Sequence, residues 1–176
     1  VMSRMEYPVP DTWYLSNQWV DVGVIHCEVE YINDVYLPYL PYRRSGKLFF
    51  PLGRLTGYWT SYQLKYAISQ GLIRINKIFK AIGYRKTQNY FSGIINHLYA
   101  LRLEAKAKKD EHLDITIKIL MNSLYGKFAE KVDSEKTFSV DGEILETVLE
   151  KVYYPAHCNV IWSVYTTAYA QTHLYN

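Results

Sequence analysis

Three polar side chains of different chemistry share one face of the helix that residues 118–128 predict. The segment reads Lys-Ile-Leu-Met-Asn-Ser-Leu-Tyr-Gly-Lys-Phe, and at about 100° per residue Lys118, Asn122 and Tyr125 point the same way. The lysine can neutralise phosphate oxygens, the amide offers donors and an acceptor, and the phenol can stack on a base or test its shape. Gly126 lets a backbone come close. Together these groups suit a nucleoside triphosphate on a nucleic-acid duplex.

The same segment resembles the fingers motif of the family B DNA polymerases, which is a lysine, three residues, Asn-Ser, one residue and Tyr-Gly, usually followed by Lys-Phe. It is similar to the protein-primed branch of viruses, linear plasmids and organelles. The resemblance implies a DNA-directed DNA polymerase, a nucleotidyltransferase of DNA replication that uses dNTP. Its partners would be a DNA primer–template and, in this branch, a terminal (priming) protein. Ser123, Gly126 and Lys127 would contact DNA. An amphipathic helix with a chance lysine is the alternative interpretation.

A second pair of cations lies upstream of this motif. Arg102 and Lys106 stand at i and i+4, so they share a helix face, and an antiparallel helix pair would bring them beside Lys118. In the family, the helix before the motif carries such a pair directed at the incoming triphosphate, whereas a basic pair alone is usually a solvated surface. Three cations would position the triphosphate and spread its developing charge. We predict nucleotide binding by Arg102, Lys106, Lys118, Asn122 and Tyr125.

Composition excludes some classes of protein without selecting one. With 176 residues, 49% hydrophobic and 21% charged, the chain is typical of soluble globular proteins rather than disordered ones. Its net charge of +3 is compatible with nucleic acid but would not indicate it. No apolar run reaches the roughly 18 residues of a membrane span, so no membrane partner is expected.

Cysteine and histidine usage indicates neither a disulfide framework nor a metal site. Cys27 and Cys158 form no CxxC motif, which favours a reduced intracellular compartment. For a protein encoded by a virus or mobile element, that compartment is the host cytoplasm, nucleus or organelle. The five histidines do not stand at metal-ligand spacing, so we expect no metal ligands among them.

The wider pattern predicts an α+β fold: part of a polymerase palm with antiparallel strands, a two-helix antiparallel fingers hairpin and a β-hairpin insertion. Strands are expected over 22–31 and 72–83, and helices over 61–70, 86–109, 111–131 and 158–175. Asp141-Gly142 between two β-rich runs predicts the hairpin. The domains are then a palm segment with a candidate priming-protein insertion (1–85), fingers (86–131), the hairpin insertion (132–156) and a palm helix (157–176).

Helix ends and buried stripes follow from the same pattern. Thr60 or Ser61 is expected to cap the first helix and Gly71 to stop it. The fingers helices should each bury one apolar stripe, which we assign to Phe91, Ile94, Ile95, Leu98 and Leu101 in the first, and to Leu113, Ile117, Leu120, Leu124 and Phe128 in the second.

Two glutamines depart from the family pattern. Gln63 stands where a glutamate is common, and Gln171 stands where the family has an arginine that holds the DNA backbone near the primer. The neighbouring Thr167 and Tyr169 fit the family and are expected to bind DNA. Without the arginine, DNA affinity and its salt dependence should both fall if the site is used.

The catalytic carboxylates of the family are expected outside these residues. Such polymerases hold two metal ions, here Mg²⁺, on aspartates from two strands. We expect one aspartate just before Val1 and the other beyond Asn176, so that this chain is an excised or processed segment. No internal Asp-x-Asp pair occurs, and we expect no catalytic residue in the chain and no polymerisation by it alone.

Two hypotheses of different class remain. In the first, the chain is the nucleotide- and DNA-binding fingers and palm portion of an active polymerase, because the motif and the upstream cations are intact. In the second, it is a catalytically inactive, polymerase-derived nucleic-acid-binding or structural protein, which the two glutamines and the missing aspartates favour.

Overall fold

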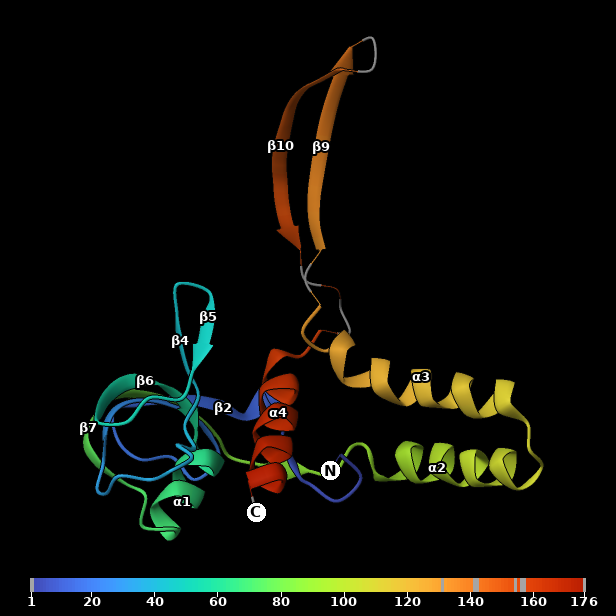
Figure 1. The fold of residues 1–176 in the computed structure, drawn as a ribbon. Helices are drawn as coiled ribbons and strands as arrows, with labels where there is room; N and C mark the ends of the chain where they lie inside the picture. Colours follow the sequence, from blue (N-terminus) through green and yellow to red (C-terminus); the bar gives the residue numbers. More distant parts are fainter. Residues whose placement is uncertain (1, 131, 141–142, 154, 156–157, 176) are drawn as a thin grey trace. The chain divides into compact units, whose positions relative to one another are not determined.

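The computed structural model describes residues 2–130, 132–140, 143–153, 155 and 158–175, with the backbone alone described at Tyr125 and over 132–153. The chain divides into two compact units, residues 1–97 with 164–176, and residues 98–163. The expected mixture of helices and antiparallel strands is confirmed (Figure 1). No helix in the described part of the chain is long and apolar enough to cross a membrane.

The first unit is built on a four-stranded antiparallel sheet. Its order is β2 (Trp13–Ser16), β7 (Ile73–Tyr84), β3 (Gly23–Tyr31) and β6 (Arg54–Thr60). The strands expected over 22–31 and 72–83 are confirmed as β3 and β7, which pair with each other. Neither β2 nor β6 was expected, because β2 is short and lies in a turn-prone segment and β6 contains a glycine.

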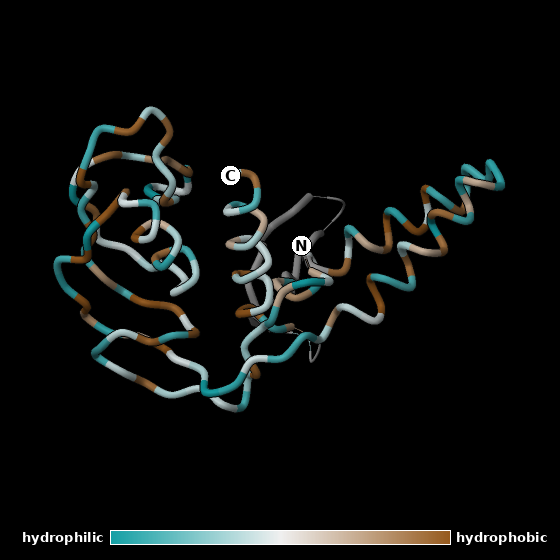
Figure 2. The backbone as a smooth tube through the Cα atoms, turned by 90° about the horizontal axis from the view of Figure 1, so that it is seen from below, coloured by the Kyte–Doolittle hydropathy of each residue, from teal (hydrophilic) through white to brown (hydrophobic). Residues whose placement is uncertain are grey.

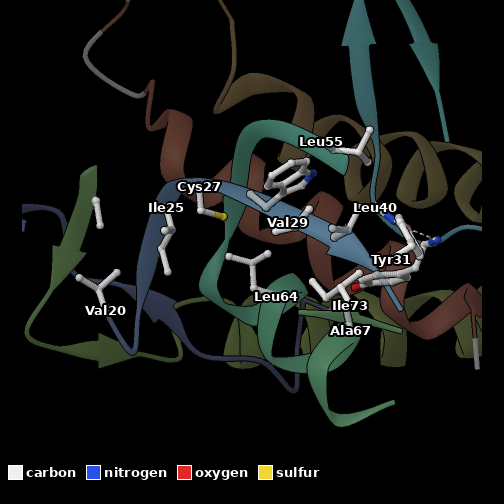
Figure 3. Close-up of a cluster of buried hydrophobic side chains, with 13 residues drawn as sticks. Val20, Ile25, Cys27, Val29, Tyr31, Leu40, Leu55, Leu64, Ala67 and Ile73 are labelled. Carbon is white, nitrogen blue, oxygen red and sulfur yellow. Dashed lines mark hydrogen bonds between the residues drawn. The ribbon is translucent and has the colours of Figure 1, made fainter. Parts of the chain in front are cut away.

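The inner face of this sheet holds the core. Buried and partly exposed residues alternate along β3, with the odd-numbered side chains inside. Figure 3 shows these side chains packed with residues from α1 (Ser61–Ser69) and from the segment around Leu40. The core cluster comprises Val20, Ile25, Cys27, Val29, Tyr31, Tyr39, Leu40, Leu55, Trp59, Leu64, Ala67, Ile73 and Ala81.

The outer face of the sheet carries rings and charges. The Tyr58 ring stacks on His26 with centroids 4.3 Å apart. Further along, Glu30 lies between two arginines on neighbouring strands, 2.8 Å from Arg74 and 3.8 Å from Arg54. The residues of β3 that face outward are only half-buried.

Helix α1 begins and ends as its sequence predicts. Thr60 is the N-cap, and its side chain accepts a hydrogen bond from the Gln63 backbone while the Gln63 side chain accepts from the Thr60 backbone. This reciprocal capping satisfies two donors that the first helical turn leaves unpaired. Gly71, with φ of +65°, follows the C-cap and turns the chain into β7.

One correction concerns the chain between the sheet and the helices. The helix expected from Lys86 begins only at Ser92 as α2 (Ser92–Ala107). Thr87 and Gln88 instead form β8, which pairs with β1 (Tyr7–Pro8). The Asn89 side chain then accepts hydrogen bonds from the backbone N–H of Phe91 (3.2 Å) and Ser92 (2.9 Å), so it starts the helix there. The remaining short elements are η1 (Pro10–Thr12), β4 (Tyr42–Arg44) and β5 (Lys47–Phe49).

The predicted antiparallel helix pair lies mainly in the second unit, which begins within α2 at Leu98. Helix α3 (Glu111–Lys127) follows α2 through a short turn in which Lys109 has φ of +57°. Asp110 caps α3 by accepting a hydrogen bond from the Leu113 backbone at 3.0 Å. Figure 2 shows apolar and polar residues alternating along both helices. Helix α3 ends four residues earlier than the predicted 131.

The buried stripes differ in part from the prediction. Ile117 and Phe128 are buried as expected, but Leu113 and Leu120 are 44% and 53% exposed. Phe91, just before α2, is buried, and Ile94 in α2 is 49% exposed. Each helix therefore buries a narrower stripe than its apolar residues suggest.

A long hairpin and a final helix complete the chain. The hairpin consists of β9 (Val132–Val140) and β10 (Glu143–Tyr153), paired antiparallel. The Asp141-Gly142 turn that predicted it lies outside the described residues. Helix α4 (Val160–Tyr175) begins two residues later than expected.

Candidate functional site

The polar face of α3 is open to solvent. Lys118 and Asn122 are both exposed. The Tyr125 side chain lies outside the described part of the structure, so its contacts stay a prediction. A Cβ added at Gly126 would meet no atom within 4 Å. The glycine therefore leaves room for an external group and is not demanded by packing within the described chain.

Arg102 and Asp114 join the two helices by an ion pair. The guanidinium Nε donates to Asp114 Oδ1 at 2.6 Å, and both side chains are 24% exposed. Within the described part of the chain this is the only hydrogen bond of the guanidinium, so its Nη hydrogens remain for another acceptor. Such partial burial strengthens the pair relative to one in bulk solvent.

This ion pair fixes where the other two predicted cations lie along the helices. Lys118 is one turn beyond Asp114 on α3, and Lys106 is one turn beyond Arg102 on α2, which runs in the opposite direction. Measured along the helix axis, Lys118 is therefore displaced by roughly 6 Å from Arg102 and by roughly 12 Å from Lys106. Arg102 is the nearer partner of Lys118.

Lys106 faces a surface of mixed charge at the helix turn. It lines a shallow pocket together with Lys109, Asp110, Glu111 and Asp114. The three carboxylates offset the two ammonium groups, so this pocket attracts a polyanion less than the face around Lys118 does. Of the three predicted cations, Lys106 is the least favourably surrounded.

The C-terminal end of α3 is anchored to the segment before α4. The Phe128 carbonyl accepts from the Asn159 backbone at 2.8 Å and from Cys158 Sγ at 3.0 Å. The Phe128 ring meets Trp162 edge to face with centroids 5.3 Å apart. Lys127 is paired with Glu130 at 2.8 Å on the exposed surface, where such pairs are worth little. Its ammonium group can therefore exchange partners at low cost.

Ser123 and Thr167 are both exposed. The Ser123 hydroxyl donates to the Leu120 carbonyl at 3.0 Å. Tyr169, in contrast, is 7% exposed, and its hydroxyl donates to the Glu6 carbonyl. Its ring packs against three other aromatic rings, which raises the pKa of the phenol by burial. The expected DNA contact by Tyr169 does not fit this placement.

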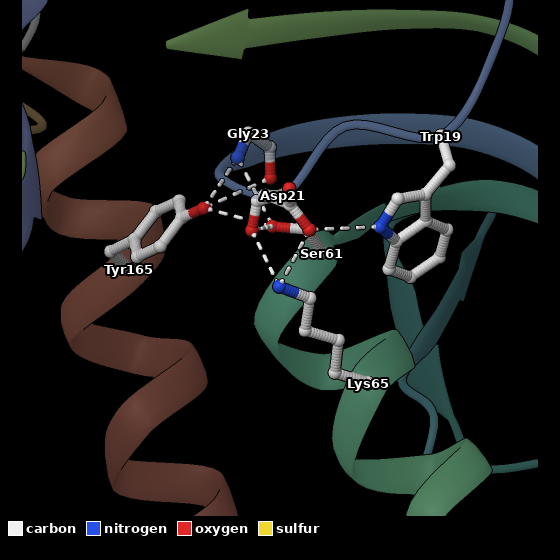
Figure 4. A network of polar contacts seen from close by, with 6 residues as sticks. All are labelled: Trp19, Asp21, Gly23, Ser61, Lys65 and Tyr165. Carbon is white, nitrogen blue, oxygen red and sulfur yellow. Dashed lines mark hydrogen bonds and ion pairs between the residues drawn. The ribbon is translucent and has the colours of Figure 1, made fainter. Parts of the chain in front are cut away.

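A second tyrosine of α4 holds the start of β3. The Tyr165 hydroxyl accepts from the Gly23 backbone N–H at 2.6 Å and donates to the Gly23 carbonyl at 3.2 Å. Ser61 Oγ lies 3.2 Å from the same hydroxyl and also accepts from Gly23 N–H at 3.1 Å (Figure 4). Burial raises the pKa of Tyr165. Sequence spacing gave no sign of this network, because its members come from three distant segments.

The outer edge of the network is a surface ion pair. Lys65 Nζ lies 3.0 Å from Asp21, which also accepts from the Trp19 ring N–H (Figure 4). The Lys65 hydrogen bond and charge hold the pKa of the exposed Asp21 carboxyl below its usual range. The Asp21 carbonyl accepts from both Lys65 Nζ and Ser61 Oγ, which joins the ion pair to the buried network.

The described residues contain no group of three or more histidine, cysteine or acidic side chains that could hold a metal ion. The carboxylate nearest the predicted triphosphate face, Asp114, is already paired with Arg102. The described donors therefore do not fit a Mg²⁺ site.

Comparison with known proteins identifies related sequences over nearly the whole chain. Residues 5–171 match the model of the family described as DNA polymerase type B, organellar and viral. The "Probable DNA polymerase" of Podospora anserina is 31% identical over 121 residues, covering 69% of this chain and 9% of that protein. The "DNA-directed DNA polymerase" of Enterobacteria phage PRD1 is 26% identical over 139 residues, covering 79% of this chain and 24% of its own length.

Solved structures of phi29 DNA polymerase share the fold. The orthorhombic crystal form matches 97% of this chain and 32% of that chain with a TM-score of 0.71 and 17% identity. A ternary complex of the same polymerase with primer-template DNA and incoming nucleotide matches equally well, at a TM-score of 0.71 and 16% identity. The chain thus spans about a third or less of each of these proteins.

Proposed function

This chain belongs to the organellar and viral type B DNA polymerases, and we propose that it forms the nucleotide- and DNA-binding fingers and palm portion of a DNA-directed DNA polymerase. The whole enzyme would carry out nucleotidyl transfer in DNA replication, inside the cell. We assign residues 1–85 to a palm segment with the priming-protein insertion, 86–131 to the fingers, 132–156 to a hairpin insertion and 157–176 to a palm helix. A terminal protein would be a partner of residues 1–85.

In the proposed site, Lys118 and Arg102 bind the triphosphate. Lys118 is exposed and free to reach phosphate oxygens, and Arg102 keeps its Nη hydrogens because Asp114 holds only its Nε. A guanidinium held along one edge loses less rotamer freedom when it binds a phosphate. Asp114 would therefore position Arg102, and Lys106 would contribute a weaker, more distant charge.

The remaining residues of the α3 face would meet the nascent base pair and the duplex. Asn122 and Tyr125 would check the base pair, while Ser123, Gly126 and Lys127 would contact the DNA backbone. The open space at Gly126 supports a close approach there. On α4, Thr167 would contact DNA, and the buried Tyr169 would support the helix instead. The Mg²⁺ ions of the reaction would be held by carboxylates other than the residues described.

The observation that carries this proposal is the exposed cationic and amide face of α3 next to the edge-held Arg102. The test is Lys118→Ala, with binding of a dNTP measured by calorimetry or by displacement of a fluorescent analogue. Loss of one charge-assisted phosphate contact should weaken binding by about 1.5–3 kcal/mol, or roughly 10- to 150-fold.

Lys47→Ala is the matched control, because Lys47 is an exposed lysine on β5 outside the proposed site. Its dNTP affinity should equal that of the unchanged chain. Equal affinities for the Lys118 and Lys47 variants would remove the nucleotide-binding role from α3.

A further inference from the structure

The two glutamines that depart from the family pattern are in direct contact. Gln63 Nε2 donates to Gln171 Oε1 at 2.6 Å, although the residues are 108 positions apart. Gln63 is 6% exposed in the first turn of α1, and Gln171 is half-buried near the end of α4. Two apparently separate departures therefore meet at one point between two helices.

Fixed backbone groups at both ends determine which way the two amides point. Gln63 Oε1 accepts from the Thr60 backbone N–H at 3.1 Å and from the Thr60 hydroxyl at 3.0 Å. At the other end, Gln171 Nε2 donates to the Tyr39 carbonyl. A backbone N–H can only donate and a carbonyl can only accept, so neither amide can turn over without losing a bond.

We propose that Gln63 and Gln171 act as one hydrogen-bonded unit that positions α4, and that Gln171 is a positioning residue and not a ligand of the DNA backbone. Its oxygen accepts from Gln63 and its NH2 group donates to the Tyr39 carbonyl, so the amide is held at both ends and a phosphate could meet only the second Nε2 hydrogen. Thr167 lies one turn before Gln171 on α4, so fixing Gln171 fixes the rotation of the helix that presents Thr167.

Changing one member of the pair to a charged residue breaks the order of donors and acceptors. With a glutamate in place of Gln63, a carboxylate oxygen faces Gln171 Oε1, and neither group has a hydrogen to donate. Turning over the Gln171 amide would place Oε1 against the Tyr39 carbonyl, which is again an acceptor facing an acceptor. With an arginine in place of Gln171, the N–H donors of the guanidinium face the N–H donors of Gln63 Nε2, and no acceptor lies between them. Turning over the Gln63 amide would place Nε2 against the Thr60 N–H, which is again a donor facing a donor.

Making both changes restores every bond. The carboxylate accepts from Thr60 and from the guanidinium, which also donates to the Tyr39 carbonyl. A glutamate–arginine pair and the glutamine–glutamine pair are therefore alternative solutions, and mixed pairs are not. The two glutamines are then one compensated exchange and no sign of a decayed gene.

The first test compares thermal unfolding of Gln63→Glu, Gln171→Arg and the double variant at pH 8. Each single change should lower Tm by roughly 4–10 °C, because it leaves buried polar groups unpaired. The double variant should return to within about 3 °C of the unchanged chain. Gln18→Glu and His173→Arg are matched controls at exposed positions, the second on α4 itself. If a single variant does not fold, a folded double variant still shows the rescue, and an unfolded double variant overturns the proposal.

The second test is the pH dependence of Gln63→Glu. A protonated carboxyl group regains a hydrogen that can be donated to Gln171 Oε1, so it imitates the lost amide. Burial and the opposing oxygen favour the neutral carboxyl group in the folded state, so they raise its pKa there. The variant should therefore be more stable at low pH and lose that stability as the pH rises. The Tm deficit of this variant should shrink by at least half between pH 8 and pH 5. A deficit independent of pH contradicts the proposed hydrogen-bond order.

The third test, which rests on the proposed function, measures binding of a labelled primer–template duplex at several KCl concentrations. The double variant should bind within about two-fold of the unchanged chain, with the same slope of log affinity against log salt. A phosphate-binding arginine would steepen that slope by about 0.9. Tighter binding by Gln171→Arg with that steeper slope and no loss of Tm overturns the proposal. If no form binds duplex, the proposed function fails, and the two stability tests still decide the role of the pair.

Discussion

The Gly23 amide at the start of β3 has two acceptors, and removing both should cost more than the sum of removing each. Tyr165 OH accepts from this N–H at 2.6 Å and Ser61 Oγ accepts from it at 3.1 Å. After Tyr165→Phe or Ser61→Ala alone, one acceptor remains. After both changes the buried N–H has neither, and an unsatisfied buried donor carries the full cost of its desolvation.

The expected magnitudes follow from the bonds that each change removes. Tyr165→Phe also takes the donor from the Gly23 carbonyl, and Ser61→Ala takes one of the two donors to the Asp21 carbonyl, where Lys65 Nζ remains. Each single change should therefore lower the free energy of unfolding by about 1–2 kcal/mol. The double variant should lose about 1 kcal/mol more than the sum of the two. In a chain of this size, 1 kcal/mol corresponds to about 2–4 °C in Tm.

Urea unfolding followed by tyrosine and tryptophan fluorescence measures these differences. Tyr36→Phe is the control, because Tyr36 is fully exposed and should lose its hydroxyl at no cost. Hydrogen exchange at the Gly23 amide gives a second readout, which should accelerate strongly only in the double variant. Losses that add to within about 0.5 kcal/mol would refute the reasoning, because they would mean that water reaches this amide.

Two further predictions concern glycine and pH. A Cβ at Gly23 would lie 2.0 Å from the Ile82 carbonyl oxygen, so Gly23→Ala should cost more than about 3 kcal/mol. Gly93→Ala, in open space on α2, should instead gain about 0.5–1 kcal/mol, as thermal unfolding will show. Burial raises the pKa of several phenols, that of Tyr39 to about 12, so the unfolded chain loses these protons first. Stability should therefore be constant up to about pH 10 and fall between pH 10 and 12, with tyrosinate absorbance at 295 nm rising in the same transition.

Local patterns in the sequence predicted the elements that depend on local signals. Alternation along β3 and the capping residues around α1 each reflect neighbours in the chain, and the structure confirms both. The predicted start of α2 was wrong because Thr87 and Gln88 pair with β1, and Asn89 caps the helix only after them. The exposed Leu113 and Leu120 show that an apolar residue on the expected face need not be covered.

The parts of the site that sequence missed depend on contacts between distant segments. Asp114 stands one turn before Lys118, which was a visible signal, but its pairing with Arg102 depends on the register between two helices. Tyr169 matched a family position yet lies in the core, because its partners at Tyr7 and Glu6 are more than 160 residues away. The Gln63–Gln171 contact was hidden for the same reason.

The alternation along β3 has a consequence for how such a chain diverges. Side chains of the inner row are buried in the core with residues of α1, while those of the outer row are half-exposed and contact side chains on the outer face of the neighbouring strands. Substitutions in the outer row can therefore accumulate without repacking the core, so the outer surface of the sheet can change during evolution while the fold is kept. A shared fold at 17% identity is compatible with this separation of the two rows.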